Sequence, residues 1–348
     1  TVAVLRPGGT VFRKPFDVYH KQSDLKDLVT YIKSLDGDTK AVLECTGSYH
    51  RPIVEALHSS GVFVSAVNPH LIKNFGNNTI RKVKTDPADA KKIARYTLDN
   101  WHDLREYSDM DANREQLKTM NTQFDFFMKQ KTAAKSNLIA LLDQTYPGVN
   151  DLFDSPVRKD GSEKWVDFAY SFWHVDCVRK LSLNAFKERY RSFCKKHGYQ
   201  YSESKAEEIY NASKELVATL PKNQGYKDLI QCSIKQLNLE SEHVEKLRID
   251  MNTLASQLPE YPVVMSMYGV GTTYGPQLMA EIGDVMRFSQ REALTAFAGV
   301  DPGKDDSGQR VTRSVKASKC GSARLRKTLF QIMSCLLQNI DRKSTRLN

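Results

Sequence analysis

Apolar and polar positions up to about residue 105 alternate between strand-like and helix-like patterns. Strand patterns show period-two alternation or a short apolar run, and helix patterns place leucines at steps of three and four. This order predicts a mixed sheet with helices on its faces. The predicted elements are strands at 1–5 and 11–18 joined as a hairpin, a helix opening at Ser23, a strand at 41–44, a helix at 52–57 and a strand at 62–67.

The middle of the chain has the pattern of long helices. Residues 117–141 carry apolar side chains in alternating steps of three and four, a heptad seam interrupted at Lys131. Residues 226–258 repeat this pattern less regularly, with Ser233 and Glu240 at seam positions. We therefore expect a coiled coil that pairs within the chain or across a homo-oligomer, as a dimer or tetramer.

Residues 150–220 separate the two seams and contain Trp165 and Trp173. Buried aromatic residues in a region of short helical patterns predict a packed cap on the coiled-coil arm.

A chain of 348 residues is too long for one ordinary hydrophobic core. We expect three folded regions: 1–110, 111–258 and a mostly helical 259–341. Residues 342–348 break the preceding helical pattern, and we interpret them as a non-native tail. Thr1 already lies within a strand pattern, so we expect residues to be missing upstream.

The charge balance favours a polyanionic partner. Lys and Arg number 51 against 41 Asp and Glu, which gives a net charge of +10. The excess is concentrated in 303–327, where a phosphate backbone is the expected partner. The charged residues of that segment are Lys304, Arg310, Arg313, Lys316, Lys319, Arg324, Arg326 and Lys327 against Asp305 and Asp306.

Other features exclude a membrane and an oxidising compartment. No run approaches the roughly 18 apolar residues of a membrane span. The six cysteines include no Cys-x-x-Cys pair, and the chain has no secretory signal. We expect a soluble cytoplasmic protein of a bacterium or archaeon.

Three carboxylates lie where a metal site could form. Glu44 ends a predicted core strand, and Asp86 and Asp89 lie three residues apart at a helix start. Carboxylates at these positions could hold Mg²⁺, which prefers oxygen ligands. The alternative is a metal-free helix start, with Asp86 as N-cap and Pro87 in the first turn.

Ser307 lies among the arginines of the basic segment. A serine there could attack a phosphodiester while guanidinium groups stabilise the transition state. The alternative is an ordinary Asp-Ser-Gly turn. Ser318 is the second candidate nucleophile because Lys319 follows it.

Two glycines open a predicted helix after Pro259. Gly269 and Gly271 could present backbone N–H groups to a phosphate, or they could form a plain tight turn. Further backbone contacts to nucleic acid are expected from the cations beside the acidic cluster and in the basic segment: Lys73, Arg81, Lys82, Lys84, Arg310, Arg313, Lys316, Lys319, Arg324 and Arg326.

Two sets of motifs resemble one known family. Residues 44–49, 67–69 and 84–90 resemble the RNase H-like (RuvC-like) domain of the Asp-Glu-Asp-Asp insertion-sequence transposases, relatives of the Piv-type invertases. Residues 268–271, 281–288, 297–302, 307–308 and 318–326 resemble that family's second domain, in order. The resemblance covers nearly the whole chain.

The resemblance implies roles for individual residues. Glu44, Asp86 and Asp89 correspond to the last three acidic residues of the tetrad, with Mg²⁺ as cofactor, and Ser307 corresponds to the catalytic serine. The first Asp is absent, since the family carries it on a strand upstream of Thr1, so this chain is expected to be impaired. Such enzymes recombine DNA through a phosphoserine link, and some are guided by a structured RNA.

The leading hypothesis is therefore a DNA transposase or recombinase that acts on element ends and target DNA. One alternative is a metal-dependent nuclease without a covalent intermediate. Another is a non-catalytic protein that binds RNA or DNA. A covalent protein–DNA adduct separates the first two hypotheses, and metal-dependent cleavage excludes the third.

Overall fold

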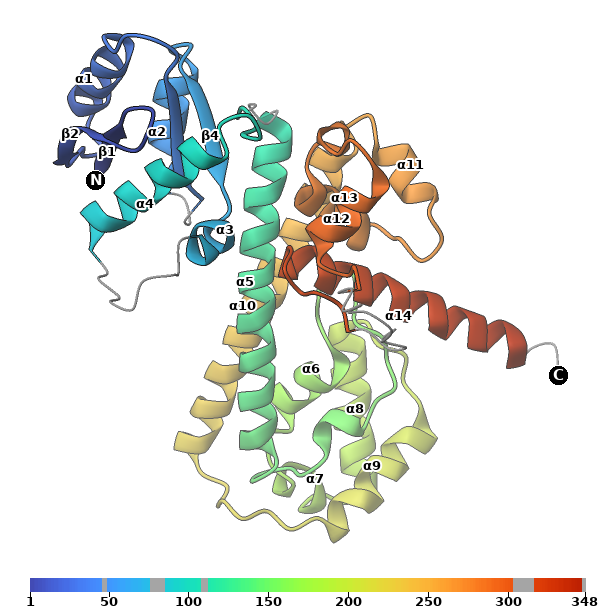
Figure 1. Cartoon of the computed structure of the whole chain (residues 1–348). Coiled ribbons are helices and arrows are strands. Elements are labelled where there is room, and N and C mark those ends of the chain that lie inside the picture. Colours follow the sequence, from blue (N-terminus) through green and yellow to red (C-terminus); the bar gives the residue numbers. More distant parts are fainter. Residues whose placement is uncertain (46–48, 76–84, 108–111, 303–315, 346–348) are drawn as a thin grey trace, which may run out of the picture. The chain divides into compact units, whose positions relative to one another are not determined.

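The computed structural model shows a mostly helical chain with few strands (Figure 1). It describes residues 1–45, 49–75, 85–107, 112–302 and 316–345. The chain divides into two compact units, Thr1–Asp109 and Met110–Asn348, called unit 1 and unit 2 below. Among the described residues, no helix is both long enough and apolar enough to cross a membrane.

In the part that the structure describes, unit 1 contains the strands and four helices. β1 pairs with β2 in an antiparallel hairpin, and β3 pairs with β4 in parallel. A small apolar core forms around Leu28, Val54, Leu57 and Val64. The elements are β1 (Val2–Leu5), β2 (Val11–Phe16), α1 (Gln22–Lys33), β3 (Lys40–Glu44), α2 (Arg51–His58), β4 (Phe63–Val67), α3 (Pro69–Asn74) and α4 (Asp86–Asp99).

The strands do not join into the single mixed sheet that the sequence predicts. Within the described residues they form two separate two-stranded sheets, β1–β2 and β3–β4. α4 packs against both β1 and β3. The elements are thus correctly predicted, but the sheet lacks a hydrogen-bonded link between β1 and β3.

Unit 2 is mostly helical in its described residues. Its α-helices are α5 (Ala112–Leu142), α6 (Lys164–Ser171), α7 (Asp176–Arg179), α8 (Leu183–His197), α9 (Glu203–Glu215), α10 (Gln224–Ala255), α11 (Tyr261–Ser266), α12 (Tyr274–Ile282), α13 (Arg291–Ala298) and α14 (Ala323–Thr345). Two short 3-10 turns, η1 (Val149–Asp151) and η2 (Val285–Arg287), lie between them.

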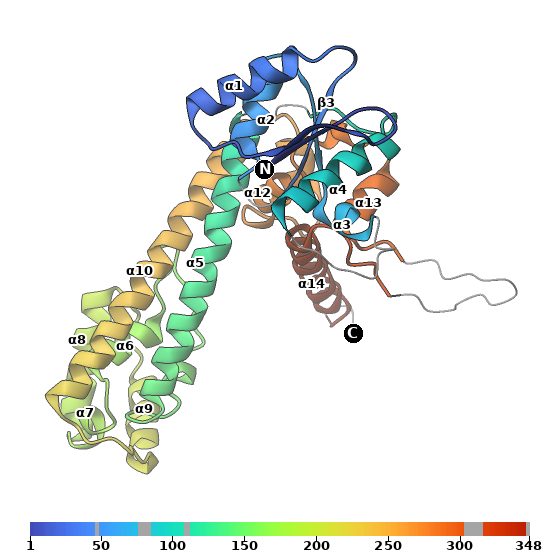
Figure 2. The ribbon, with the colours of Figure 1, turned by 60° about the vertical axis from the view of Figure 1, so that its left-hand side comes forward.

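The long helices α5 and α10 run side by side in opposite directions (Figure 2). The ring of Phe127 lies 5.0 Å from that of His243, which fixes their relative register. Leu117 near the start of α5 shares a core with Ala255 at the end of α10, and Leu138 shares another with Ile230. The contact expected between the two seams is therefore made within the chain.

The cap expected between the seams is a second core at the far end of this helix pair. Trp165 and Trp173 are 5% and 4% exposed, and they belong to the same buried core as aromatic residues of α6, α8 and α9. Phe168 lies at the centre, with ring contacts to Tyr146, Phe172 and Phe193. The large rings fill the space between short helices that could not bury a core alone.

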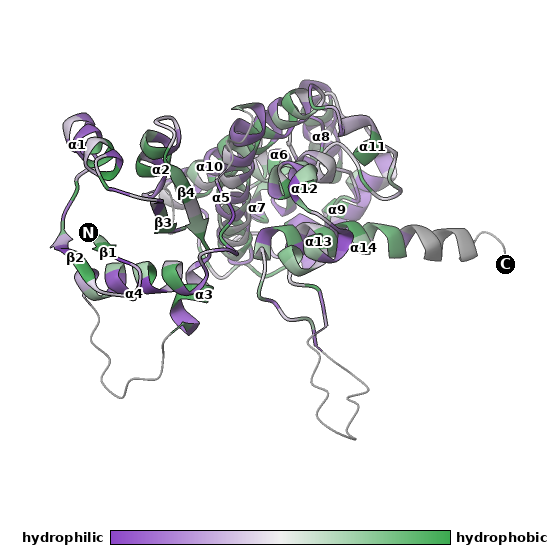
Figure 3. Ribbon diagram, turned by 45° about the horizontal axis from the view of Figure 1, so that its top comes forward, coloured by the Kyte–Doolittle hydropathy of each residue, from purple (hydrophilic) through white to green (hydrophobic). Residues whose placement is uncertain are grey.

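The last helix extends further than the sequence indicates. α14 continues to Thr345, so the expected break of the helical pattern at residue 342 is wrong. Arg342 and Lys343 are good helix formers, and each residue added to an existing helix needs no new nucleus. α14 carries apolar residues at helical spacing, and Figure 3 shows both hydrophilic and hydrophobic residues along its coloured part.

The helix pair makes a stability prediction. Leu138 of α5 is fully buried in the core that it shares with α10 and the cap, so Leu138→Ala should lower the free energy of unfolding by about 2–5 kcal/mol. Leu239 on α10 is 50% exposed, and Leu239→Ala should stay within about 0.5 kcal/mol of the parent. Urea unfolding followed by circular dichroism measures both. Equal losses in the two variants would contradict the pairing of these helices.

Candidate functional site

The carboxylates of unit 1 lie at the ends of two elements. Glu44 is the last residue of β3 and is half-buried. Asp86 begins α4 and is exposed, while Asp89 in the same first turn is half-buried. Thr85, with extended backbone at φ −143°, holds the N-cap position, so the helix starts one residue earlier than the metal-free alternative assumed.

α4 runs back along β3, which brings these ends to the same side of unit 1. Lys40 at the start of β3 donates its Nζ to the carbonyl oxygen of Trp101, beyond the end of α4, at 2.8 Å. Lys92 in the first half of α4 donates to the carbonyl of Lys73, just after β4, at 3.2 Å. The N-terminal half of α4 therefore lies toward the carboxyl ends of β3 and β4, where Glu44 lies.

The structure does not gather the three carboxylates into one ligand set. No group of three or more His, Cys, Asp or Glu residues that could hold a metal is present in the described part of the chain, which includes all three. The donor chemistry suits Mg²⁺, since all are hard oxygen ligands, but the grouping does not. We therefore derive no catalytic step through a metal.

Among the cations predicted beside this cluster, Lys73 is exposed at the end of α3. Arg81, Lys82 and Lys84 lie outside the described residues.

The two glycines that precede α12 differ in their surroundings. Gly269 has φ +83°, and a Cβ there would lie 2.7 Å from the Leu336 side chain of α14. Gly271 has open space around it and no positive φ. Gly269 is thus explained by a tight turn against α14, while Gly271 leaves room for a close approach by another molecule.

The residues just before 303 and just after 315 contact each other, and we call this paired segment the stem. Pro302 and Ala317 form a β-bridge. Ser318 donates its backbone N–H to the Asp301 carbonyl at 2.9 Å and its Oγ to Asp301 Oδ1 at 2.6 Å. Lys319 follows with φ +56°, a left-handed conformation that is uncommon for lysine. The bridge and these hydrogen bonds therefore hold together the two described flanks of residues 303–315.

Two glycines make the stem possible. A Cβ at Gly299 would lie 2.6 Å from the backbone nitrogen of Gly321, and a Cβ at Gly321 would lie 2.2 Å from the Phe297 carbonyl oxygen. Ser322 donates its N–H to the same Phe297 carbonyl at 2.7 Å. The end of α13 and the approach to α14 pack backbone against backbone, which only glycine allows.

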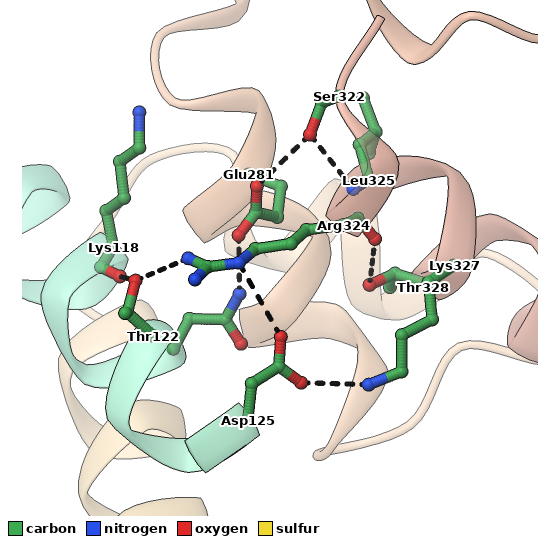
Figure 4. A network of polar contacts seen from close by, with 10 residues as sticks. Lys118, Thr122, Asp125, Glu281, Ser322, Arg324, Leu325, Lys327 and Thr328 are labelled. Carbon is green, nitrogen blue, oxygen red and sulfur yellow. Dashed lines mark hydrogen bonds and ion pairs between the residues drawn. The ribbon is translucent and has the colours of Figure 1, made fainter. Parts of the chain in front are cut away.

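A buried carboxylate ties the stem to the long helices (Figure 4). Glu281 of α12 is 6% exposed and accepts a hydrogen bond from Asn121 Nδ2 of α5 at 2.8 Å. It also accepts one from Ser322 Oγ at 3.4 Å, and Ser322 Oγ accepts from the N–H of Leu325 in the first turn of α14. One carboxylate thus joins three helices.

Several predicted phosphate contacts have partners inside unit 2. Arg324 donates to Thr122 Oγ1 at 2.6 Å, and Lys327 donates to Asp125 Oδ1 at 2.9 Å (Figure 4). Arg326 donates to the carbonyl of Ala298 at 3.0 Å. These contacts hold α14 against α5 and α13, which gives Arg324 and Arg326 a structural role whether or not they also contact phosphates.

The other cations of the basic segment are placed differently. Lys316 and Lys319 are exposed at the stem. Ser307, Arg310 and Arg313 lie outside the described residues. Close to the stem, burial lowers the pKa of Arg287, although Asp284 opposes the shift; its guanidinium stacks on the rings of Phe288 and Phe297.

Sequence reasoning missed Asn121 and Asp125 because both lie within a heptad pattern. Asn121 is 2% exposed in the structure. The signal in the sequence was a polar residue directly beside the apolar seam, where a buried side chain needs a hydrogen-bond partner. Its partner Glu281 lies 160 residues away along the chain, and nothing local indicates that distance.

Comparison with known proteins adds the remaining information. A DEDD-type IS110 transposase model matches residues 1–147, and a model described as "Transposase IS116/IS110/IS902 family" matches residues 261–347. A relative from Streptomyces coelicolor, an uncharacterized 43.6 kDa protein of insertion element IS110, is 25% identical over 251 residues. That match covers 72% of this chain and 60% of the relative's length.

The two glycines before α12 offer a matched pair of variants. Gly269→Ala should destabilise unit 2 by at least about 1 kcal/mol, because the added Cβ is strained and meets Leu336. Gly271→Ala should cost less than about 1 kcal/mol. Differential scanning calorimetry measures both, and a larger loss for Gly271→Ala would contradict the packing described here.

The Glu281 network predicts that the stability of one variant depends on pH. Asn121→Asp puts a second carboxylate next to Glu281, so the pair should hold a proton with a raised pKa in the folded state. The loss of stability should exceed about 1.4 kcal/mol at pH 8 and shrink toward pH 5, where the shared proton is bound. Asn121→Ala, which adds no charge, should lose stability by a similar amount at both pH values. Unfolding measured at the two pH values decides; a pH-independent loss for Asn121→Asp would refute the network.

Proposed function

This chain belongs to the IS110 family of transposases, and from that premise we propose that it cuts and rejoins DNA with Ser307 as nucleophile. Transposase activity on insertion-element DNA is the property that the family gives. The serine mechanism, the metal ligands, a guide RNA and oligomerisation are our proposals for this chain.

The stem is the observation that carries the serine proposal. Asp301 and Ser318 are joined by two hydrogen bonds, and Glu281 ties the chain just beyond them to α5 and α12. The described residues on both sides of the segment that contains Ser307 are thereby held by the helices of unit 2. Such an anchor favours a nucleophile, because a reacting atom misplaced by about 1 Å can lose on the order of 100-fold in rate.

The proposed reaction exchanges one phosphate ester for another, so the free energy of the broken phosphodiester bond is kept in the bond to Ser307. Ser307 Oγ attacks a phosphorus atom and loses its proton, and one bond from phosphorus to a deoxyribose oxygen breaks. The departing oxygen takes up a proton and becomes a hydroxyl. A hydroxyl of another strand then attacks the phosphoserine, restores a phosphodiester and releases Ser307 with its proton.

The cations close to Ser307 in the sequence are proposed to act directly in this reaction. Arg310 and Arg313 would stabilise the charge on the phosphate oxygens during attack, and Lys316 and Lys319 would bind neighbouring phosphates. Lys73, Arg81, Lys82 and Lys84 of unit 1 are proposed as further backbone contacts.

The carboxylates of unit 1 are proposed as ligands of a divalent metal, which the DEDD family type indicates. Such an ion would supply charge neutralisation at a phosphodiester. Glu44, Asp86 and Asp89 supply oxygen donors from one side of unit 1. Since they are not gathered in the structure, we assign them no step.

The partners follow from the same chemistry. DNA at the element ends and at the target is the proposed substrate, and a structured RNA is a proposed guide. We also propose a homo-oligomer, because exchange of two duplexes needs more than one nucleophile. The apolar seams of α5 and α10 already pack against each other within the chain. A contact between two copies through this helix pair would therefore use its outer faces.

Ser307→Ala should separate chemistry from binding. Loss of the hydroxyl should reduce strand exchange by at least about 1,000-fold, while DNA affinity changes less than about threefold, because one neutral hydroxyl adds little to phosphate binding. Ser318→Ala is the matched control and should keep exchange within about tenfold, since it removes only the hydrogen bond to Asp301 and a long one from the Cys320 N–H. Exchange of labelled duplexes and filter binding measure the two quantities.

Activity that survives in Ser307→Ala but not in Ser318→Ala would move the nucleophile to Ser318. Cleavage that survives in both variants would favour a metal-dependent nuclease. Binding without any cleavage by the intact gene product would favour the non-catalytic alternative.

Arginine variants test the phosphate contacts. Arg310→Ala or Arg313→Ala should weaken DNA binding and reduce the slope of log affinity against log salt by roughly one unit per lost contact. Arg324→Ala is the control, because its guanidinium contacts Thr122: it should lower the melting temperature, with a smaller change of slope. Equal slopes for all three variants and the parent would refute the assigned contacts.

A further inference from the structure

Three cations of the cap gather around two aromatic rings. The Nζ atom of Lys164 lies 4.8 Å from the centre of the Phe153 ring and 5.2 Å from that of Tyr199. The guanidinium of Arg158 lies 4.0 Å from the Tyr199 ring, and Lys205 lies 5.9 Å from the Phe153 ring. All three cations are half-buried, and we call them the cap cation cluster.

The carboxylates that neighbour these cations in the sequence bind other partners. Glu163, next to Lys164, accepts a hydrogen bond from Lys135 of α5 at 2.7 Å. Glu203 accepts one from Lys187 of α8 at 2.8 Å. In the part of the chain that the structure describes, Lys164 forms no ion pair with a carboxylate.

Other carboxylates near the cluster neutralise it only in part. Asp167 accepts a hydrogen bond from the Tyr199 hydroxyl at 2.6 Å, and Asp160 accepts two within its own turn. Glu208 pairs with Lys205 at 2.7 Å, from an exposed position. Among the described residues, the three cations thus have one carboxylate in direct ion-pair contact.

Arg158 is fixed at the end of α8 with most of its donors unused. Its Nη2 atom donates to the carbonyl oxygens of His197 and Gly198, at 2.7 and 3.2 Å. Its Nε and Nη1 atoms have no hydrogen-bond partner among the described residues. A guanidinium held through one nitrogen can present the others to the oxygens of an anion.

The cluster is unfavourable as long as no anion binds to it. Burial is the largest cause that lowers the pKa of Lys164, and the charges of Lys205 and Arg158 lower it further, although the Cys194 thiol opposes the shift. Like charges repel each other, and half-buried charges lose hydration. Arrangements that break a local rule in this way are expected at functional sites.

We propose that the cap cation cluster binds phosphate groups of a DNA backbone. Phosphate oxygens accept hydrogen bonds from guanidinium and ammonium groups and would offset the repulsion between them. Lys195 and Lys196 are exposed in the last turn of α8, the turn that Arg158 contacts, and they add positive charge there. DNA is the polyanion on which a transposase acts, which favours it over other anions.

The site goes beyond the proposed function. The two family models match residues 1–147 and 261–347, and the cap cation cluster lies between these ranges. The inference rests on DNA as the substrate of the family and not on Ser307 as the nucleophile. Each readout below is a binding measurement, so a failure of the serine mechanism leaves the test valid.

The test is lysine footprinting of the full chain. The protein is acylated with and without a DNA duplex of arbitrary sequence at low ionic strength, and mass spectrometry measures the reaction of each lysine. Acylation of Lys164 and Lys205 should slow by up to about tenfold with the duplex at about ten times its Kd, because only the unbound fraction reacts. This protection should fade as the salt concentration rises.

Lys214 is the matched control within the cap. It stacks on the Tyr210 ring at 4.5 Å, and no second cation stacks on that ring among the described residues. Its acylation should change less than about twofold, because the duplex has no cluster to bind there.

Charge variants test the site without the reagent. Lys164→Gln should reduce the slope of log affinity against log salt by roughly one unit, as expected for one lost phosphate contact. Lys164→Arg keeps the charge and should keep the parent slope, and Lys214→Gln should keep it too. Circular dichroism verifies that each variant folds, and the footprint of the parent chain decides if Lys164→Gln does not.

Several results would overturn the proposal. One is unchanged acylation of Lys164 while a mobility shift shows that the duplex is bound, and another is equal protection of Lys214. The parent slope in folded Lys164→Gln would also refute it. Protection by inorganic phosphate that matches the duplex would make the ligand a small anion, and protection by RNA but not by DNA would make it RNA.

Discussion

The antiparallel contact between α5 and α10 is the interaction on which unit 2 depends. One end of the pair buries the aromatic cap around Phe168, and the other end supplies the surface for α12 and α14. Asn121 and Thr122 stand on α5 and reach Glu281 and Arg324 in the C-terminal cluster. If the pair separated, the base of the stem would lose its support, although no residue of the stem lies in the pair itself.

Unit 1 depends instead on which strand edges pair through hydrogen bonds. α4 contacts both small sheets and carries Asp86 and Asp89 toward the end of β3, but no described strand links the sheets. Glu44 lies at the end of β3, where the pairing of β3 with β4 places it, and it lines a cleft between the two small sheets. The described residues do not bring it together with Asp86 and Asp89 into one ligand set.

Local patterns in the sequence predict the elements well, because hydrophobic periodicity is a local property. The hairpin of β1 and β2 and the strands β3 and β4 follow from such patterns, as do the long helices. Long-range pairings could not be predicted. Asn121 gives no sign of its bond to Glu281, and Arg324 resembles a phosphate contact until Thr122 is seen beside it. The prediction of a single mixed sheet was wrong because strand patterns do not specify which strand edges pair.

The most direct test of the central claim is peptide mapping of a covalent complex. The intact gene product is incubated with a nicked DNA substrate that traps the intermediate, digested with protease and nuclease, and sequenced by mass spectrometry. The account predicts a nucleotide attached to the peptide that contains Ser307. A nucleotide on the Ser318 peptide, or cleaved DNA with no modified peptide, would contradict it.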